Sequence, residues 1–264
     1  MSEPVLVAVA HGSSDPRAAA TTRGLMAIAA ERAAARGLRV PDLRIAYLGH
    51  AAPSLPQVMS TLEPDTPVTV LPLLLTAAYH SKTDIPRVLA RLSRDCPRRV
   101  GYGAALGPHP LLLRALGRRL AEADRGREAD RGREADPGRT VAAQTGVVLA
   151  AAGSSDPDAN ATIACLAAQW RARTGWFAVR PAYAASADAP SPAAAVTALL
   201  RAGAPRVVVA TYLLAPGVFA DRIRDASRAA GAAAVSAALG AAPEVADVLL
   251  DRYRETGSGR RAAA

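Results

Sequence analysis

Short apolar runs alternate along the chain with longer stretches in which apolar residues recur every three or four positions. In the first half, the apolar runs cover residues 5–10, 43–48, 68–75 and 99–104. Runs that are apolar at nearly every position are typical of strands covered on both faces by helices, as in a parallel sheet. The stretches between the runs predict the helices that cover the sheet.

The second half of the chain repeats this order of elements. Its apolar runs cover residues 147–151, 177–183, 206–214 and 232–237. Strands and helices alternate throughout both halves, which is the pattern of α/β proteins. The sequence therefore predicts two duplicated Rossmann-like lobes over residues 1–121 and 146–256, each a four-stranded parallel sheet flanked by helices.

The first apolar run stops abruptly at His11, which opens the motif His-Gly-Ser-Ser-Asp-Pro. The same strand and turn return at residues 147–157, but Ala152 stands where the first copy has His11. Ligands of parallel sheets collect at the carboxyl ends of the strands. The duplication therefore locates the chemistry in the first half of the chain.

A second histidine, His80, lies in residues 76–86, which follow the third apolar run. Pro72 cannot donate a hydrogen bond to a neighbouring strand, so we expect regular pairing to end near Leu71 and His80 to lie at the same sheet edge. In the second half, Phe219 falls at the place of His80. Because both histidines are present in one copy and absent from the other, we expect them to serve one site.

The turn after His11 is suited to an anion. Ser13, Ser14 and Asp15 can each cap the helix that follows. A helix that starts here leaves backbone N–H groups and its positive dipole end beside His11. Gly12, Ser13 and Ser14 are therefore candidate ligands of an acidic group.

Two segments depart from the repeat. A charged hexamer, Glu-Ala-Asp-Arg-Gly-Arg in its first two copies, is written three times over residues 122–139 with almost no apolar side chain. Alternating charge favours a further turn or two of helix, but each glycine costs about 1 kcal/mol relative to alanine, and the segment cannot build a core. We expect residues 122–145 to be a solvated linker and residues 257–264 to be a disordered tail.

Composition and net charge limit the kinds of partner that we expect the protein to bind. The net charge of +9 would suit a nucleic acid, an acidic membrane or a ligand with several carboxylates. No block of basic residues interleaved with aromatics occurs, so we expect no nucleic-acid partner. No apolar stretch approaches the roughly twenty residues of a membrane span, and the first run is too short for a signal peptide. We therefore expect a cytoplasmic protein that binds no membrane.

The histidines are the candidates for metal chemistry, because two isolated cysteines indicate neither a disulfide framework nor a thiolate metal cluster. For His50 and His109, a hydrogen-bonded structural role is the more common one. Because His11 and His80 occur in only one of the two copies, a functional role is favoured for them. Neutral imidazole binds first-row divalent metals and accepts a proton near neutral pH, so two imidazoles suit transient metal binding.

Four motifs and the duplication together carry a family resemblance. The motifs are His-Gly-Ser-Ser-Asp-Pro at 11–16, Pro-Ser at 53–54, Tyr-His-Ser-Lys-Thr-Asp-Ile-Pro at 79–86 and Leu-Gly-Pro-His-Pro at 106–110. In this combination the chain resembles the sirohydrochlorin chelatase family, the CbiX/SirB type of class II chelatase. The resemblance spans nearly the whole chain apart from the hexamers and the tail.

The resemblance implies a lyase that inserts Fe2+ or Co2+ into sirohydrochlorin or a related tetrapyrrole, in a cleft between two α/β lobes. His11 and His80 match the histidines that bind the incoming metal and accept pyrrole protons. The expected contacts of the tetrapyrrole are Gly12, Ser13, Ser14 and Tyr79. The metal is then a substrate, no permanently bound cofactor is expected, and we expect a monomer.

One position departs from the family pattern. The resemblance implies a glutamate or aspartate at the end of the second strand, where this chain has Gly49 with His50 beside it. Either His50 takes that role as a third metal ligand, or the third group is absent.

A histidine phosphatase is a weak alternative. That class would need an arginine directly before the histidine, where this chain has Ala10.

Three functions stay open at this point. We expect insertion of Fe2+, which gives sirohaem. The alternatives are a cobalt chelatase of cobalamin synthesis and a non-catalytic module that binds a tetrapyrrole or a metal. Binding and insertion use the same ligands, so only turnover separates an enzyme from a module.

Overall fold

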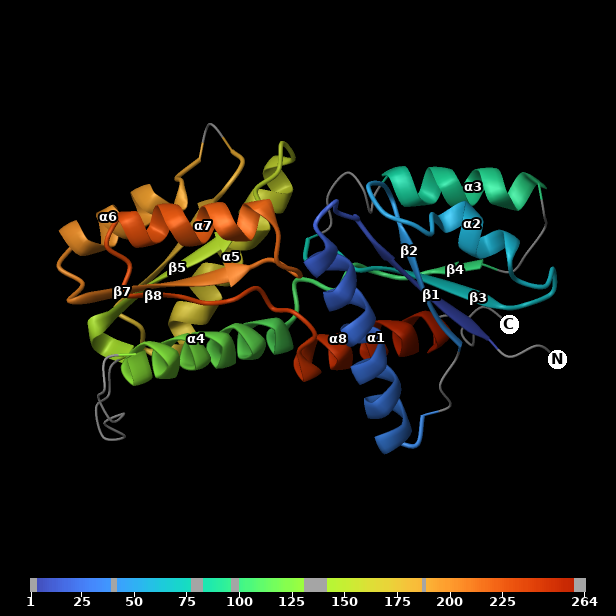
Figure 1. The fold of residues 1–264 in the computed structure, drawn as a ribbon, viewed down its shortest axis with the longest axis horizontal. Helices are drawn as coiled ribbons and strands as arrows, with labels where there is room; N and C mark the ends of the chain where they lie inside the picture. The colour runs from blue at the N-terminus through green and yellow to red at the C-terminus, as the bar shows by residue number, and fades with distance from the viewer. Residues whose placement is uncertain are drawn as a thin grey trace. The chain divides into compact units, whose positions relative to one another are not determined.

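The computed structural model describes residues 4–38, 42–76, 83–95, 100–130, 142–186 and 189–258. The first sheet contains β1 (Val5–Ala10), β2 (Asp42–Tyr47), β3 (Val68–Pro72) and β4 (Val100–Tyr102). The second contains β5 (Thr145–Ala151), β6 (Ala178–Tyr183), β7 (Arg206–Tyr212) and β8 (Ala234–Val235). Their strand orders, β2-β1-β3-β4 and β6-β5-β7-β8, are equivalent, and every pairing is parallel. The duplicated α/β fold predicted from the sequence is confirmed (Figure 1).

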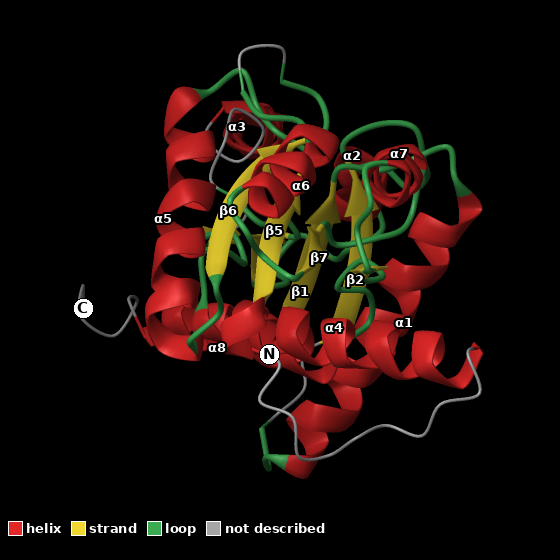
Figure 2. Ribbon diagram, turned by 90° about the vertical axis from the view of Figure 1, so that its left-hand side faces the viewer, coloured by secondary structure: helices red, strands yellow, loops and turns green. Residues whose placement is uncertain are grey.

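Helices separate successive strands and enclose both sheets (Figure 2). They are α1 (Pro16–Ala35), α2 (Leu55–Ser60), α3 (Ile85–Asp95), α4 (Pro110–Asp130), α5 (Pro157–Thr174), α6 (Pro192–Arg201), α7 (Val218–Ala229) and α8 (Pro243–Ser258). A short 3-10 helix, Ala142–Gln144, precedes β5. The central strands β1 and β5 are buried along their whole length, as their unbroken apolar runs predict.

The third strand of the first copy is shorter than its apolar run. Pro72 is the last residue of β3 and pairs with Val9. The next backbone N–H, that of Leu73, donates to the carbonyl of Val9 at 2.8 Å. The chain then leaves the sheet, because proline offers no N–H to continue the ladder on its own side. The prediction that regular pairing ends near Leu71 is therefore confirmed.

Two compact units divide the chain differently from the two halves of the sequence. Unit 1 comprises Met1–Leu112 and Gly240–Ala264, and unit 2 comprises Leu113–Leu239. Helix α8 therefore belongs with the first copy and most of α4 with the second. The expected lobes 1–121 and 146–256 follow the order of the repeat, whereas the packing groups these two helices with the other copy.

Complementary contacts hold α8 in unit 1. Gly24 of α1 has no side chain, and a Cβ built there would lie 3.3 Å from the Cβ of Ala241. The Asp247 carboxylate of α8, only 10% exposed, pairs with Arg32 and, at 2.6 Å, with Arg36. A buried carboxylate is stable only when it is paired and hydrogen-bonded, so these arginines fix α8 against α1.

Helix α4 is held in unit 2 by the same kind of interaction. The Arg119 guanidinium donates to the Leu239 carbonyl at 2.9 and 3.1 Å. Asp124 pairs with Arg206 at the start of β7. Both contacts join residues that are far apart in the sequence, which is why local patterning did not assign α4 to this unit.

The expected linker, residues 122–145, is in part a helix. Helix α4 continues through the first hexamer to Asp130, whereas residues 131–141 lie outside the described residues. Glu122 forms ion pairs with Arg118 at 2.5 Å and with Arg119 at 2.8 Å, one helical turn earlier. Such pairs at helical spacing favour the helix that the glycines disfavour. Similarly, the first two residues of the expected tail 257–264 end α8, and the others lie outside the described residues.

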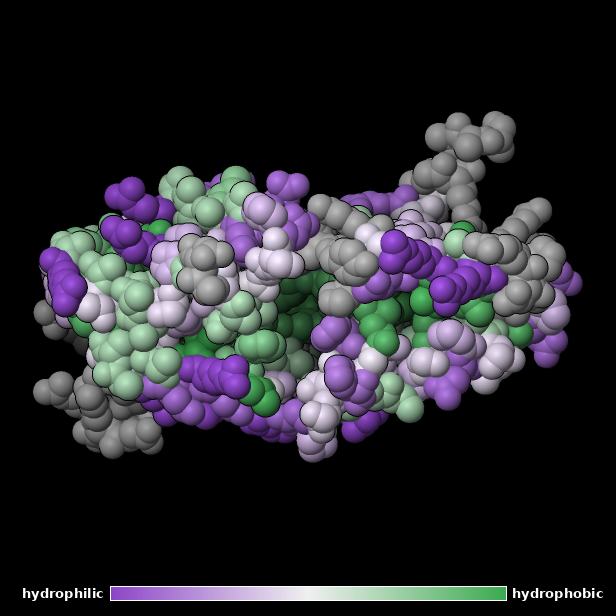
Figure 3. Space-filling model, turned by 90° about the horizontal axis from the view of Figure 1, so that it is seen from above, coloured by the Kyte–Doolittle hydropathy of each residue, from purple (hydrophilic) through white to green (hydrophobic). Residues whose placement is uncertain are grey.

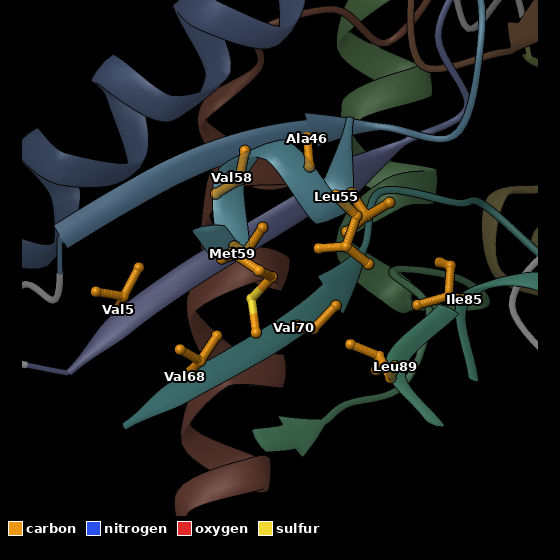
Figure 4. Close-up of a cluster of buried hydrophobic side chains, with 11 residues drawn as sticks. Val5, Ala46, Leu55, Val58, Met59, Val68, Val70, Ile85 and Leu89 are labelled. Carbon is orange, nitrogen blue, oxygen red and sulfur yellow. The ribbon is translucent and has the colours of Figure 1, made fainter. Parts of the chain in front are cut away.

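Each sheet has a hydrophobic core on the face that its shorter helices cover. In unit 1, Val5, Val7 and Val9 of β1 pack with buried residues of α2 and α3, of which Leu55, Met59, Ile85 and Leu89 are labelled in Figure 4. In unit 2, residues of β5 and β7 pack against α6 and α7 in the same way. The opposite face of the first sheet lies against α1 and α8 (Figure 1). Burial on both faces fixes the strands, so their carboxyl ends are firm supports for a site.

The surface of the described residues is mixed. Figure 3 shows hydrophilic and hydrophobic residues side by side over both units. Large hydrophobic side chains that are exposed number four among the described residues, and they are Tyr102, Leu200, Val218 and Phe219. None of the described helices is both long and apolar enough to cross a membrane.

His109 has the structural role that the sequence favours. Its Nδ1 accepts a hydrogen bond of 3.2 Å from the backbone N–H of Leu111, in the first turn of α4. Only neutral imidazole with a free Nδ1 can accept this bond. Burial, together with the nearby Arg252 guanidinium, lowers the pKa of His109, although Asp251 and Glu255 act in the opposite direction.

This lowered pKa predicts a pH dependence of stability. The unfolded chain binds a proton on His109 more readily than the folded chain, so the stabilisation is complete above the ordinary pKa of 6.5 and declines as the pH falls below it. His109→Asn keeps an acceptor at the helix start but does not titrate. We expect urea unfolding to show a smaller loss of stability between about pH 7 and pH 5 in His109→Asn than in the unmodified chain. Equal losses in both proteins would contradict this role.

Candidate functional site

His11 lies directly after β1, at the carboxyl edge of the first sheet. The ladder between β1 and β2 continues past the ends of both strands, because Leu48 N–H donates to Ala10 C=O at 3.0 Å and Gly49 N–H donates to His11 C=O at 3.1 Å. The backbone of His11 is therefore fixed against the turn that follows β2. Its side chain is exposed at this edge.

Gly12 and Gly49 make the closest approach in this corner. Gly12 has φ +90°, and a Cβ built on it would lie 1.7 Å from the Gly49 carbonyl oxygen. Any other residue would collide with that backbone and would adopt an unfavourable positive φ. Glycine at position 12 is what allows the turn after β2 to lie against the turn after β1.

His50 follows this contact with an unusual backbone. Its φ of 59° is the only positive value for a non-glycine residue in the described part of the chain. The turn is closed by Tyr47 N–H, which donates to Pro53 C=O at 2.9 Å, and by the bridge between Tyr47 and Ser54. A left-handed backbone costs roughly 1–2 kcal/mol for a residue with a side chain, and such strain is concentrated at functional sites.

The two turns bring His11 and His50 together. Their ring centroids are 6.4 Å apart, with an angle of 62° between the ring planes. Two imidazoles that share one metal have centroids on the order of 5–6 Å apart, because each metal–nitrogen bond is about 2.1 Å. Small rotations of these two exposed side chains would place both on one ion. The edge can thus offer a pair of borderline nitrogen ligands and a proton acceptor.

Tyr79 and His80 lie outside the described residues. They belong to the segment between β3 and α3, and β3 is the neighbour of β1 in the sheet. Within the described ranges, no three histidine, cysteine, aspartate or glutamate side chains gather as a metal cluster.

Asp15 is the residue that caps α1. Its carboxylate accepts the Arg17 N–H at 2.9 Å, and its own N–H donates to Ser13 Oγ at 3.1 Å. The hydrogen bond and charge of the Arg17 side chain lower the pKa of Asp15. Among the described residues, no acceptor for the backbone N–H of Ser13 is found.

The equivalent corner of the second copy is closed by an amide. Ser154 N–H donates to Asn160 Oδ1 at 3.1 Å, and Asn160 Nδ2 donates to Ser154 C=O at 2.8 Å. The Tyr183 hydroxyl donates to the Asn160 carbonyl at 2.7 Å, which supports the arrangement. In the first copy, Ala19 stands at the place of Asn160.

The two corners therefore differ in what they can bind. A methyl group at Ala19 cannot accept a hydrogen bond, so the first corner can receive a carboxylate or another anion at the Ser13 N–H. In the second corner the internal amide already occupies the corresponding N–H of Ser154. Sequence reasoning missed this difference, although the alignment of the two copies contained the signal.

A separate cavity of about 490 Å³ lies between α5 and β6 in unit 2. Its lining consists mainly of alanine side chains of α5 with Trp176, Val179 and Pro181. None of the candidate site residues lines it. The candidate site is thus an open sheet edge and not this cavity.

The two four-stranded parallel sheets, each flanked by helices, have the chelatase fold. The profile of the CbiX family matches residues 5–123 and 146–256, and the chain belongs to this family. The match omits the segment that contains most of the charged hexamers.

Solved structures support the same fold. SirB from Bacillus subtilis with Fe3+ superposes with a TM-score of 0.74 at 24% identity, covering 98% of both chains. The sirohydrochlorin chelatase SirB from Bacillus subtilis subspecies spizizenii, in complex with cobalt, gives 0.71 at 23% identity, covering 98% of this chain and 97% of that one. At such identities these similarities establish the fold alone.

A curated relative, a sirohydrochlorin cobaltochelatase from Priestia megaterium, is 29% identical over 159 residues. The aligned part is 60% of this chain and 48% of the relative. The chain thus matches about half the length of this curated relative.

The contact between Gly12 and Gly49 can be tested with a matched pair of variants. Gly12 and Gly153 occupy equivalent turns with φ +90° and +89°, but a Cβ at Gly153 meets nothing closer than the Tyr183 Cβ at 3.1 Å. We expect Gly153→Ala to lower the free energy of unfolding by roughly 1–2 kcal/mol through its positive φ. Gly12→Ala should cost clearly more, because the Gly49 carbonyl must move. Equal losses in chemical denaturation would show that the two turns do not depend on this approach.

Proposed function

We propose that the chain is a sirohydrochlorin chelatase. The reaction exchanges two pyrrole N–H protons of the free tetrapyrrole for one divalent metal ion, so each turnover consumes a metal ion and releases two protons. It requires a metal ligand that can release its ion, a proton acceptor and a means of holding an anionic macrocycle. Membership of the CbiX family and the cobaltochelatase relative support this class of reaction.

The observation that carries the proposal is the asymmetry between two otherwise equivalent sheet edges. The first edge has a histidine pair whose ring centroids are 6.4 Å apart, and the described residues offer no acceptor to the Ser13 N–H. The second edge has Ala152 in place of His11, and Asn160 fills its corner. A metal ligand and an anion site that are retained together in one copy suit a substrate pair of a cation and a polycarboxylate.

In this proposal, each group of the first edge has one task. His11 and His80 bind the incoming metal and accept the pyrrole protons, with His50 as the third ligand in place of the family's acidic residue. An open histidine site can release the metal to the macrocycle, unlike a closed cage of ligands. The remaining residues hold the carboxylates and the ring of the tetrapyrrole, and they are Gly12, Ser13, Ser14 and Tyr79.

We propose Fe2+ as the physiological metal and sirohaem as the product. Imidazole nitrogens accept both Fe2+ and Co2+, and intrinsic affinity alone favours the later metals such as Ni2+. Metal supply in the cell would then select the product, and iron is the more general need. A site of this kind should therefore process Co2+ in vitro as well.

An anaerobic assay of sirohydrochlorin with Fe2+, Co2+ or Ni2+ tests the reaction and the histidines. We expect insertion of Fe2+ and Co2+ by the unmodified chain and none by the double variant His11→Ala with His80→Ala. His50→Ala should lower turnover at least about tenfold, because one metal ligand and proton acceptor is lost. His109→Asn, the control, should retain turnover. Full activity of the double variant would contradict the assignment, and metal binding without insertion by the unmodified chain would indicate the non-catalytic module.

The open corner can be closed by copying the second half of the chain. Ala19→Asn introduces the amide that occupies the corner in the second copy. We expect it to raise KM for sirohydrochlorin about tenfold with little change in kcat, because one charge-assisted hydrogen bond is blocked. Ala20→Asn, on the exposed side of the same helical turn, is the matched control and should leave KM unchanged. If both variants behave alike, the Ser13 corner does not bind the substrate.

A further inference from the structure

An apolar pair is exposed at the start of α7. Val218 is 61% exposed and Phe219 is 41% exposed, although the chain contains only two phenylalanines. Large apolar side chains at a surface are informative when they are adjacent and held in place. Both residues follow β7, so they stand at the carboxyl edge of the sheet of unit 2.

In the alignment of the two copies, this pair falls at the position of His80. In the sheets, Thr211 pairs with Ala150 just as Pro72 pairs with Val9, so Thr211 and Pro72 are equivalent. Counting forward from these two residues aligns Phe219 with His80. Counting back instead from the equivalent buried isoleucines, Ile85 and Ile223, aligns Val218 with His80. By either route, the second copy has an apolar side chain where the first copy has a proposed metal ligand.

Hydrogen bonds hold the end of β7, from which the chain leads to the pair. Thr211, the penultimate residue of β7, donates two buried hydrogen bonds to Ser236, from its N–H to the hydroxyl at 3.0 Å and from its hydroxyl to the carbonyl at 2.8 Å. Gly217 then adopts φ 155°, a conformation favourable only for glycine, and α7 begins at the next residue. This geometry holds Val218 and Phe219 outward on the first turn of a helix.

A cation lies on the same side of the helix as the pair. Arg222 is three residues after Phe219 and four after Val218, which places all three on one face of α7. Arg222 is exposed and has no ion-pair partner among the described residues. Arg224, two positions later, is by contrast paired with Asp221 at 2.7 Å and with Asp225 at 2.9 Å.

We propose that Val218, Phe219 and Arg222 form a tetrapyrrole-binding surface on unit 2. The ring face of the macrocycle lies on the apolar pair, and a peripheral carboxylate pairs with Arg222. The inference rests on the proposed chelatase function and extends it to the copy that has lost the histidines. An amphipathic ligand with an apolar plane and an acidic rim complements an apolar pair beside an exposed guanidinium.

The experiment separates binding from turnover. Metal-free sirohydrochlorin is titrated into the full chain and its variants, and binding is followed by the absorbance and fluorescence of the tetrapyrrole. We expect Phe219→Ala to weaken binding and raise KM about tenfold, and Arg222→Ala about fivefold, with kcat changed less than about twofold in each. Phe219→Trp and Arg222→Lys should recover part of the affinity, since they keep the aromatic face or the charge.

Two matched controls lie in unit 2 away from the proposed surface. Leu200→Ala removes another exposed apolar side chain of unit 2, in α6, and Arg228→Ala removes an exposed arginine in the last turn of α7. Both should bind sirohydrochlorin as the unmodified chain does. Unfolding curves for all variants show whether any loss of binding reflects loss of the fold.

Three outcomes would overturn the inference. If Phe219→Ala and Arg222→Ala bind and metallate sirohydrochlorin like the unmodified chain, the inference fails while the proposed function stands. If the unmodified chain neither binds nor metallates sirohydrochlorin, the proposed function fails and this inference fails with it. If Phe219→Ala instead abolishes self-association of the chain in sedimentation, with unchanged tetrapyrrole binding, the pair is an interface between copies.

Discussion

The approach of Gly12 to the carbonyl of Gly49 is the constraint on which the candidate site depends. Two parallel strands carry their backbones to the same edge, and only the missing side chain at position 12 lets the following turns touch. The hydrogen bond from Gly49 to His11 then fixes one histidine, and the left-handed backbone of His50 directs the other. The chemistry proposed for this edge follows from a backbone contact between two glycines.

Duplication gave both copies the same scaffold and let their edges diverge. The strand orders and the helix starts at Asp15 and Asp156 are equivalent in the two units. The differences that concern the candidate site lie at the carboxyl edge, where the second copy has Ala152, Asn160 and Phe219. Because a sheet buried on both faces tolerates little change, the exposed edge is where one copy can specialise without loss of the fold.

Helix α4 ends the first copy of the repeat, but most of it packs in unit 2. Helix α8 ends the second copy, but it packs in unit 1. Unit 1 lacks a helix over α1 until the carboxyl-terminal part of the chain supplies α8, whose Asp247 then pairs with Arg32 and Arg36. These partners are separated by most of the sequence, so no local pattern joins them. An arginine-rich composition also hides which arginines form ion pairs within the chain, as Arg32 and Arg36 do with Asp247.

The sequence by itself determined the strands, the duplication, the family and the side of the duplication that has the histidines, because each is written in short-range patterns or in the comparison of the two halves. Only the tertiary structure decided that α8 completes unit 1, that α4 continues through the first hexamer to Asp130, and that His50 lies beside His11. Those outcomes depend on ion pairs and backbone contacts between distant segments. Local periodicity states which face of an element is buried, but it does not state which distant residue will cover it.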